Sequence, residues 1–164
     1  MRARIIISAV LLIALVLSLA GCDRMKPVEY CELAIVLNVD FEPYDSKGAF
    51  DVAYSDGNVI MGMMRYSFVD CEEYGLLSTH TPEKLAEVYL DKSNDNKDIE
   101  ILKTGDVPYY YYTSSEGYVY LVSFYRTPYA YFIVTYITPI GKFADTYTDI
   151  INYMESAYIL EQHL

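Results

Sequence analysis

The alternation of apolar and polar side chains predicts a β-hairpin in the first half of the chain. Residues 50–55 carry a large apolar side chain at every second position, which is the period of a strand. Asp56-Gly57 follows, a dipeptide typical of two-residue hairpin turns because these turns require positive φ. Residues 58–68 then return as a longer strand. Residues 32–38, apolar and rich in β-branched side chains, predict a first strand before this hairpin.

Two amphipathic stretches predict helices. Thr81-Pro82 is a helix start, with threonine as the N-cap and proline at the first helical position, and the apolar stripe of Leu85, Val88 and Tyr89 continues to about residue 92. The second helix is expected over residues 143–158, where apolar and acidic side chains fall on opposite faces. Residues 93–98 between the first helix and the next strand are polar and predict a loop.

The remaining strands form a meander. Two of them are apolar on both faces, which indicates a sheet covered on both sides, because a half-solvated strand would alternate with polar residues. Antiparallel hairpins with helices on the sheet faces define an α+β fold with about six to seven strands. The four strands are expected over residues 99–103, 107–113, 117–125 and 129–138.

The order of elements resembles the PsbP-like fold, an α/β/α sandwich. The resemblance rests on the helix TPEKLAEVYL after the first hairpin and on the closing amphipathic helix, and it covers the whole region after the N-terminal apolar run. This fold is found in an extrinsic photosystem II subunit, a Ran-binding import factor and many small bacterial lipoproteins. Because its known members mostly act by binding other proteins, the resemblance implies a protein-binding module. No functional residue carries over, because no site motif matches. The alternative is a cystatin- or NTF2-like curved sheet.

The N-terminus has the layout of a secretory signal. Two arginines precede a short apolar core that ends in Leu19-Ala20-Gly21-Cys22. This sequence resembles the lipobox of bacterial lipoproteins, which implies lipidation of Cys22 and cleavage before it. An uncleaved span is disfavoured because spanning needs about 20 apolar residues, and cleavage without lipid would not need the cysteine. We expect a signal peptide over 1–21, a lipidated cysteine and short tether over 22–29, and one α+β domain over 30–164.

The lipid on Cys22 would anchor the protein to the cell membrane on its extracytoplasmic face. The net charge is −11 for the full sequence, and removing the two arginines of the signal makes it −13. A chain this acidic is repelled by phosphate backbones, so nucleic acid is not expected as a partner.

The sequence contains no recognisable catalytic or metal-binding pattern, so no cofactor, metal site or enzymatic activity is expected. Cys71 and His80 are a conceivable nucleophile–base pair, but no signature surrounds them. His163 lies next to the last residue. The stretch beginning at Asp91 hints at a calcium loop, yet it lacks the required glycine and glutamate. Gly62 is interpreted as a packing or bulge glycine within its strand.

Cys31 and Cys71 are not expected to form a disulfide. If residues 32–38 open a three-strand meander, the two cysteines lie at opposite ends of the sheet, whereas a disulfide requires α-carbons within about 7 Å. An enzyme with a site near Cys71 and His80 remains the alternative to a binding module.

The tyrosines provide the candidate working surface. The chain has 19 tyrosines and no tryptophan, and ten of the tyrosines lie between Tyr109 and Tyr136. Two helices are too narrow to cover a seven-stranded sheet, so part of its apolar surface should stay open unless the loop over 39–49 covers it. Pro108 indicates a strand end or an edge position. The predicted binding patch for a protein or glycan partner is one of two pairs in this row: Tyr110 with Tyr112, or Tyr109 with Tyr111.

Overall fold

The computed structural model describes residues 24–92 and 99–160. The predicted signal peptide, Cys22, the loop over 93–98 and His163 lie outside the described residues. Within the described parts, no helix is both long and apolar enough to cross a membrane.

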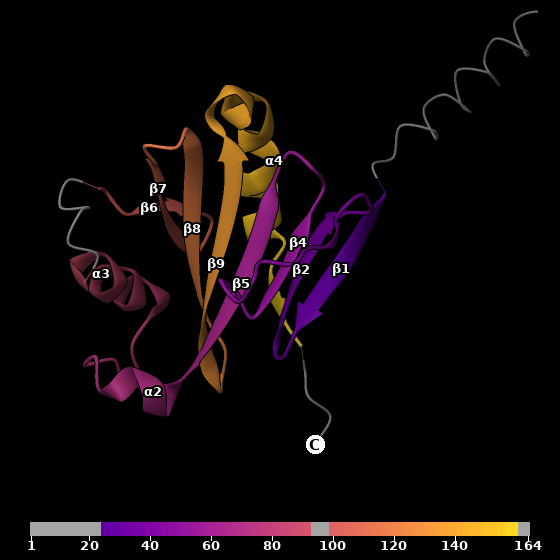
Figure 1. Ribbon diagram of the computed structural model, residues 1–164. Coiled ribbons are helices and arrows are strands. Elements are labelled where there is room, and N and C mark those ends of the chain that lie inside the picture. Colours follow the sequence, from indigo (N-terminus) through magenta and orange to yellow (C-terminus); the bar gives the residue numbers. More distant parts are fainter. Residues whose placement is uncertain (1–23, 93–98, 161–164) are drawn as a thin grey trace, which may run out of the picture.

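A seven-stranded sheet forms the centre of the molecule (Figure 1). Its strand order is β3-β4-β5-β9-β8-β7-β6, and every neighbouring pair is antiparallel. The long central strands are apolar on both sides, as the sequence predicted, and therefore need cover on both faces. The strands are β3 (Glu42–Pro43), β4 (Val52–Ser55), β5 (Ile60–Ser67), β6 (Leu102–Thr104), β7 (Val107–Thr113), β8 (Tyr118–Arg126) and β9 (Ala130–Pro139).

The predicted hairpin is present, but its loop is longer than two residues. The ladder between β4 and β5 closes at Ser55 and Ile60, so residues 56–59 form the connection. The carboxylate of Asp56 accepts hydrogen bonds from the amides of Asn58 and Val59, at 2.8 and 2.7 Å. These bonds give the aspartate a role in the loop that the two-residue prediction did not include.

A second, three-stranded sheet contains β1 (Met25–Tyr30), β2 (Leu33–Asn38) and β10 (Tyr158–Ile159). It corrects two predictions. The stretch predicted to be a tether up to residue 29 is a strand from Met25 on, paired with β2. The strand expected at 32–38 does form, but it does not pair with the hairpin, because β1 and β10 occupy its two edges.

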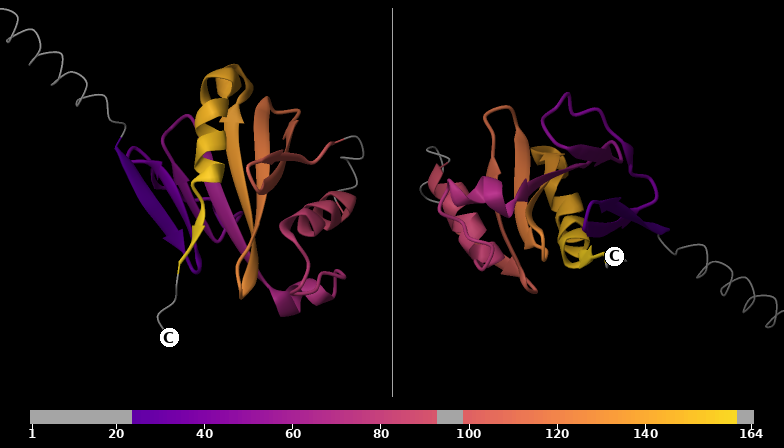
Figure 2. Two further views of the ribbon diagram at one scale, coloured as in Figure 1. Left: turned by 180° about the vertical axis from the view of Figure 1, so that it is seen from behind. Right: turned by 90° about the horizontal axis from the view of Figure 1, so that it is seen from below.

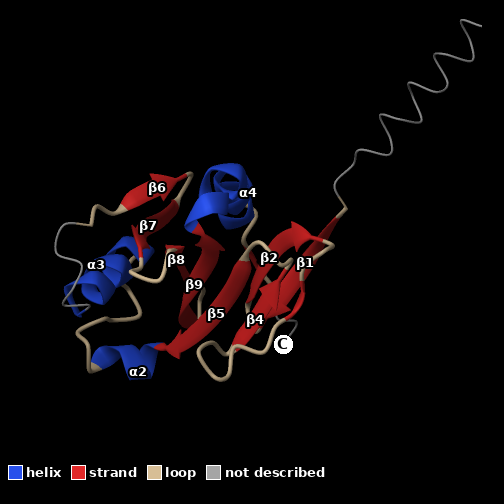
Figure 3. Ribbon diagram, turned by 45° about the horizontal axis from the view of Figure 1, so that its top comes forward, coloured by secondary structure: helices blue, strands red, loops and turns tan. Residues whose placement is uncertain are grey.

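Helices cover both faces of the large sheet (Figures 2 and 3). On one side lie α2 (Phe68–Glu72) and α3 (Pro82–Lys92), and on the other lies α4 (Phe143–Glu155), preceded by the 3₁₀ turn η1 (Ile140–Lys142). The sequence predicted α3 and α4 but not α2, because the strand that corresponds to β5 was expected to extend to Phe68. Instead Ser67 caps α2, since its hydroxyl accepts a hydrogen bond from the amide of Asp70.

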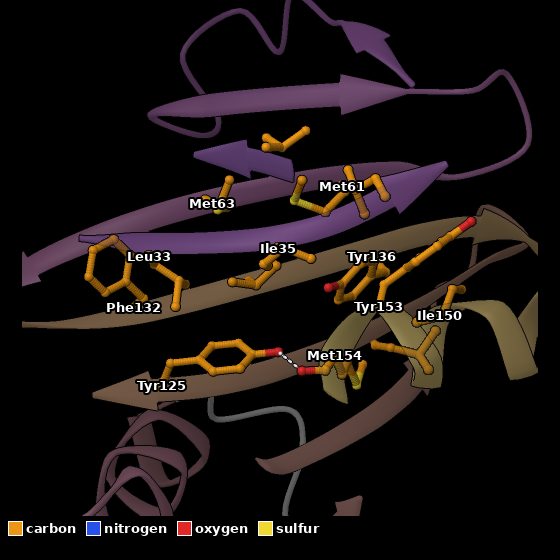
Figure 4. Packing of buried hydrophobic residues seen from close by; sticks show 14 of the residues in the cluster. Leu33, Ile35, Met61, Met63, Tyr125, Phe132, Tyr136, Ile150, Tyr153 and Met154 are labelled. Carbon is orange, nitrogen blue, oxygen red and sulfur yellow. Dashed lines mark hydrogen bonds between the residues drawn. The ribbon is translucent and has the colours of Figure 1, made fainter. Parts of the chain in front are cut away.

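The larger core lies between the large sheet, α4 and the three-stranded sheet (Figure 4). Ile150 and Met154 of α4 are fully buried against it. Tyr125 of β8 is buried here too, and its hydroxyl donates a 3.2 Å hydrogen bond to the carbonyl oxygen of Met154, drawn as a dashed line in Figure 4. The three-stranded sheet thus takes the place of a second helix on this face.

The α+β class and the antiparallel sheet with helical layers are confirmed. Cys31 and Cys71 are free, as predicted, but the geometric reason differs. Cys31 follows β1 in the three-stranded sheet and is exposed, whereas Cys71 belongs to α2 and is buried against the other face of the large sheet.

Candidate ligand pocket between α3 and the sheet

A pocket of about 610 Å³ opens between α2, α3 and the large sheet. This is the size range of small-molecule sites, roughly 300–1,000 Å³. The sequence predicted uncovered apolar surface on the sheet, and the pocket is where α3 leaves it uncovered. It is lined by Ala49, Phe50, Met64, Tyr66, Cys71, Tyr74, Leu76, Leu85, Val88, Tyr89, Lys92, Tyr110, Tyr112, Tyr120, Val122, Ile133 and Thr135.

Alternation along β7 and β8 builds the floor. Tyr110 and Tyr112 of β7 face the pocket together with Tyr120 and Val122 of β8. Tyr112 pairs with Tyr120 across the two strands, and their rings stack with centroids 5.0 Å apart and planes 7° apart. The floor is therefore a wide aromatic surface rather than a set of separate side chains.

Helix α3 provides the wall. Its apolar stripe turns toward the sheet, so that Leu85 is buried and Tyr89 packs edge-on against Phe124 with ring centroids 5.7 Å apart. These contacts fix the helix on the sheet. The sequence predicted the stripe but not that the helix would leave a pocket beside it.

The rim combines a loop and a helix end. Phe50, at the end of the loop that the sequence placed over 39–49, lies directly over Gly62, where an added Cβ would come within 2.3 Å of the ring. The interpretation of Gly62 as a packing glycine is thus confirmed. Across the rim, the Lys92 ammonium lies 3.4 Å from the centroid of the Tyr74 ring. Of the side chains that line the pocket, Lys92 alone carries a charge.

Five of the tyrosine hydroxyls in the pocket make no hydrogen bond to a described residue. Tyr66 donates to the sulfur of Met64 at 3.4 Å, whereas the hydroxyls without such a bond are those of Tyr74, Tyr89, Tyr110, Tyr112 and Tyr120. Burial raises the pKa values of Tyr89, Tyr110 and Tyr112, and neighbouring tyrosines raise those of Tyr110 and Tyr112 further. The hydroxyls therefore stay protonated and can donate hydrogen bonds.

The tyrosine row from Tyr109 to Tyr112 is divided between the two faces. The expectation that one pair of this row is exposed is wrong for Tyr109 and Tyr110, which are both buried, Tyr109 in the core with α4 and Tyr110 in the cluster with α3. Strand β6 pairs alongside Pro108, so β7 is not at the edge of the sheet. Tyr109 shares a 3.0 Å hydrogen bond with Tyr147 of α4. Tyr111 is 44% exposed, and Tyr112 is partly buried in the pocket beside Tyr110.

Several pocket residues were not among the sequence candidates. Tyr66, Tyr89 and Lys92 come from a strand and a helix far from the tyrosine row in sequence. The sequence predicts Tyr89 only as part of the apolar stripe of α3, and residue 92 only as the end of that helix. No local pattern relates these residues to Tyr110 and Tyr112. The packing of α3 on β7 and β8 brings Tyr89 and Lys92 to the pocket, and the strand order β5-β9-β8-β7 brings Tyr66 to it.

Cys71 and His80 do not form a nucleophile–base pair. Their side chains are not hydrogen-bonded to each other, and the Nδ1 atom of His80 accepts instead from the amide of Leu77 at 3.2 Å. Desolvation, and next the nearby Asp70, raises the pKa of the Cys71 thiol, which disfavours the thiolate. Cys71 lines the pocket as a small apolar residue, and His80 is not among the lining residues.

Comparisons with known proteins identify the fold. No protein-family model and no curated protein matches the sequence. The structure is similar to the solution structure of cyanobacterial PsbP (CyanoP) from Synechocystis sp. PCC 6803, with a TM-score of 0.56 and 11% identity over 85% of this chain and 95% of that one. It is also similar to a crystal structure from Bacteroides thetaiotaomicron VPI-5482, with a TM-score of 0.55 and 9% identity over 85% of this chain but only half of that one. The chain therefore has a PsbP-like fold.

Proposed function

We propose that this protein is a lipid-anchored, extracytoplasmic binding module whose ligand site is the pocket between α3 and the large sheet. One observation carries the proposal. A pocket of about 610 Å³ is lined by aromatic and aliphatic side chains, and five of its tyrosine hydroxyls make no hydrogen bond within the described structure. Such a lining suits recognition of an apolar compound with a few polar groups.

The same pocket supports binding rather than catalysis. Among its lining residues there is no carboxylate or imidazole to act as a general base, and the thiol of Cys71 is held in its neutral form. An enzyme with a site near Cys71 and His80, the alternative drawn from the sequence, has no observation in its favour.

The proposed location comes from the sequence around Cys22. A lipid there would place the module on the outer face of the cell membrane, and the partner is then a component of the envelope or a membrane protein. Strand β1 begins at Met25, so the tether is about three residues and spans at most roughly 10 Å.

Extraction of bound compounds tests the pocket as a ligand site. Ala49 is exposed and lines the rim, so Ala49→Trp should close the pocket without disturbing the core. Protein purified from its own membranes is extracted with organic solvent, and the extract is analysed by mass spectrometry. We expect a compound with the parent protein that is missing from Ala49→Trp. The matched control is Ala144→Trp on the exposed surface of α4, which should retain it. Identical extracts from all three proteins would contradict the proposal.

A further inference from the structure

The polar groups of the pocket define a ligand chemistry more narrowly than its apolar lining does. Tyr110 is only 1% exposed, and its hydroxyl has no partner among the described residues. This hydroxyl lines the pocket and keeps its hydrogen-bonding capacity for a molecule that enters. The hydroxyls of Tyr89 and Tyr112 line the same pocket and likewise have no partner among the described residues.

The charge at the rim has one sign. Lys92 ends α3, and within the described structure its ammonium makes no ion pair, because it lies against the face of the Tyr74 ring. The other lysine of this helix, Lys84, is paired with Glu87 at 2.8 Å. An unpaired ammonium beside protonated hydroxyls is a set of hydrogen-bond donors, and donors of this kind select an acceptor with negative charge.

The floor adds a preference for shape. The stacked rings of Tyr112 and Tyr120 offer a flat surface, and Tyr110 is tilted by 31° to Tyr112 at a centroid distance of 6.2 Å. Flat rings gain additional stabilisation from offset stacking on such a surface, beyond the burial of their area.

We propose, on the basis of the function proposed above, that the pocket binds a small aromatic carboxylate. Its rings lie over the floor of Tyr112 and Tyr120, and its carboxylate accepts hydrogen bonds from Lys92 and from the hydroxyl of Tyr110. The occupant is a free small molecule and not a side chain of a partner protein, because the lining residues carry a single charge, the ammonium at the rim, and the pocket has a small-molecule volume.

The two probes are 2-naphthoate and its neutral counterpart 2-naphthamide, which share the same rings. Their dissociation constants for the purified full chain are measured by equilibrium dialysis, with detergent buffer alone as the reference. We expect naphthoate to bind about tenfold more tightly than naphthamide, the ratio that one charge-assisted hydrogen bond produces.

Substitutions test whether Lys92 and Tyr110 cause the preference for naphthoate over naphthamide. Lys92→Met and Tyr110→Phe should each reduce the affinity for naphthoate by about tenfold while changing that for naphthamide little. The matched controls are Lys142→Met and Tyr118→Phe, two exposed positions outside the pocket, which should leave both affinities unchanged. Circular dichroism checks that each variant is folded, and Tyr112→Phe replaces Tyr110→Phe if the latter is not.

The inference is overturned if neither probe binds or if both bind with equal affinity. It is also overturned if the affinity for naphthoate is the same in the parent protein, in Lys92→Met and in both tyrosine variants. Crosslinking of a partner protein through the Ala49 position, without binding of either probe, would instead assign the pocket to a side chain of that partner. A compound recovered by extraction that proves uncharged would leave the proposed function standing and remove only the carboxylate.

Discussion

Gly62 shows how a single residue shapes the rim of the pocket. Its missing side chain makes room for the ring of Phe50, whose Cγ atom would lie 2.3 Å from an added Cβ. We predict that Gly62→Ala lowers the free energy of unfolding by about 1–3 kcal/mol, the usual cost of overpacking. Urea denaturation measures it. In a Phe50→Ala background the same substitution should cost much less, and an equal cost in both backgrounds would show that the ring is not the cause.

Individual side chains also mark the limit of what the sequence could predict. The alternation in β7 and β8 assigned Tyr110, Tyr112 and Tyr120 to their strand faces, and the cores confirm that assignment. It did not predict that Tyr109 is buried, because burial there depends on α4 and on Tyr147, which are distant in sequence. Alternation gives the face on which a side chain lies, whereas exposure depends on what packs against that face.

At the scale of elements, a salt bridge joins the two sheets. Glu32, in the turn between β1 and β2, is only 4% exposed and accepts two hydrogen bonds from the guanidinium of Arg65 in β5, at 2.9 and 2.8 Å. Hydrogen bonding to Arg65 lowers the pKa of Glu32, so the carboxylate stays charged at neutral pH. We predict that Arg65→Met destabilises the protein by about 3 kcal/mol, because it leaves that charge buried without a partner.

The matched double variant separates the charge from the packing. Adding Glu32→Leu to Arg65→Met removes the unpaired carboxylate and should restore most of the lost stability, as replacement of buried ion pairs by apolar residues often does. The midpoint of urea unfolding is compared for the parent, the two single variants and the double variant. A double variant no more stable than Arg65→Met would show that the stability lost in Arg65→Met does not come from the unpaired carboxylate.

Elements differ in how far the sequence predicts them. Helices α3 and α4 were predicted from their apolar stripes and the Thr81-Pro82 start, and the structure confirms them. Strand β1 was missed, because Pro27 and its charged neighbours resemble a linker until β2 is known to pair with it. Helix α2 was missed because Phe68 continues the apolar run of β5. The pairing of an edge strand is a long-range choice that local pattern does not encode.

At the scale of the whole molecule, the two faces of the large sheet are packed differently. The face toward α4 and the three-stranded sheet is a filled core, whereas the face toward α3 contains the pocket. Strand β1 is the first strand of the described chain and lies on the side of the filled core (Figure 1). Strand β1 and the pocket therefore lie on opposite sides of the large sheet.

The proposed lipid anchor at Cys22 can be tested by substitution of this residue. Cys22→Ala removes the thiol to which the lipid would attach, so the variant should lack fatty acid, remain unprocessed or be released, and no longer partition with detergent. Metabolic labelling with a radioactive fatty acid followed by detergent phase separation measures both effects. Cys31→Ala is the matched control, because Cys31 is exposed and free but follows β1 within the domain, and it should keep the label. An unlabelled parent protein with an intact N-terminus after cleavage would exclude the lipid.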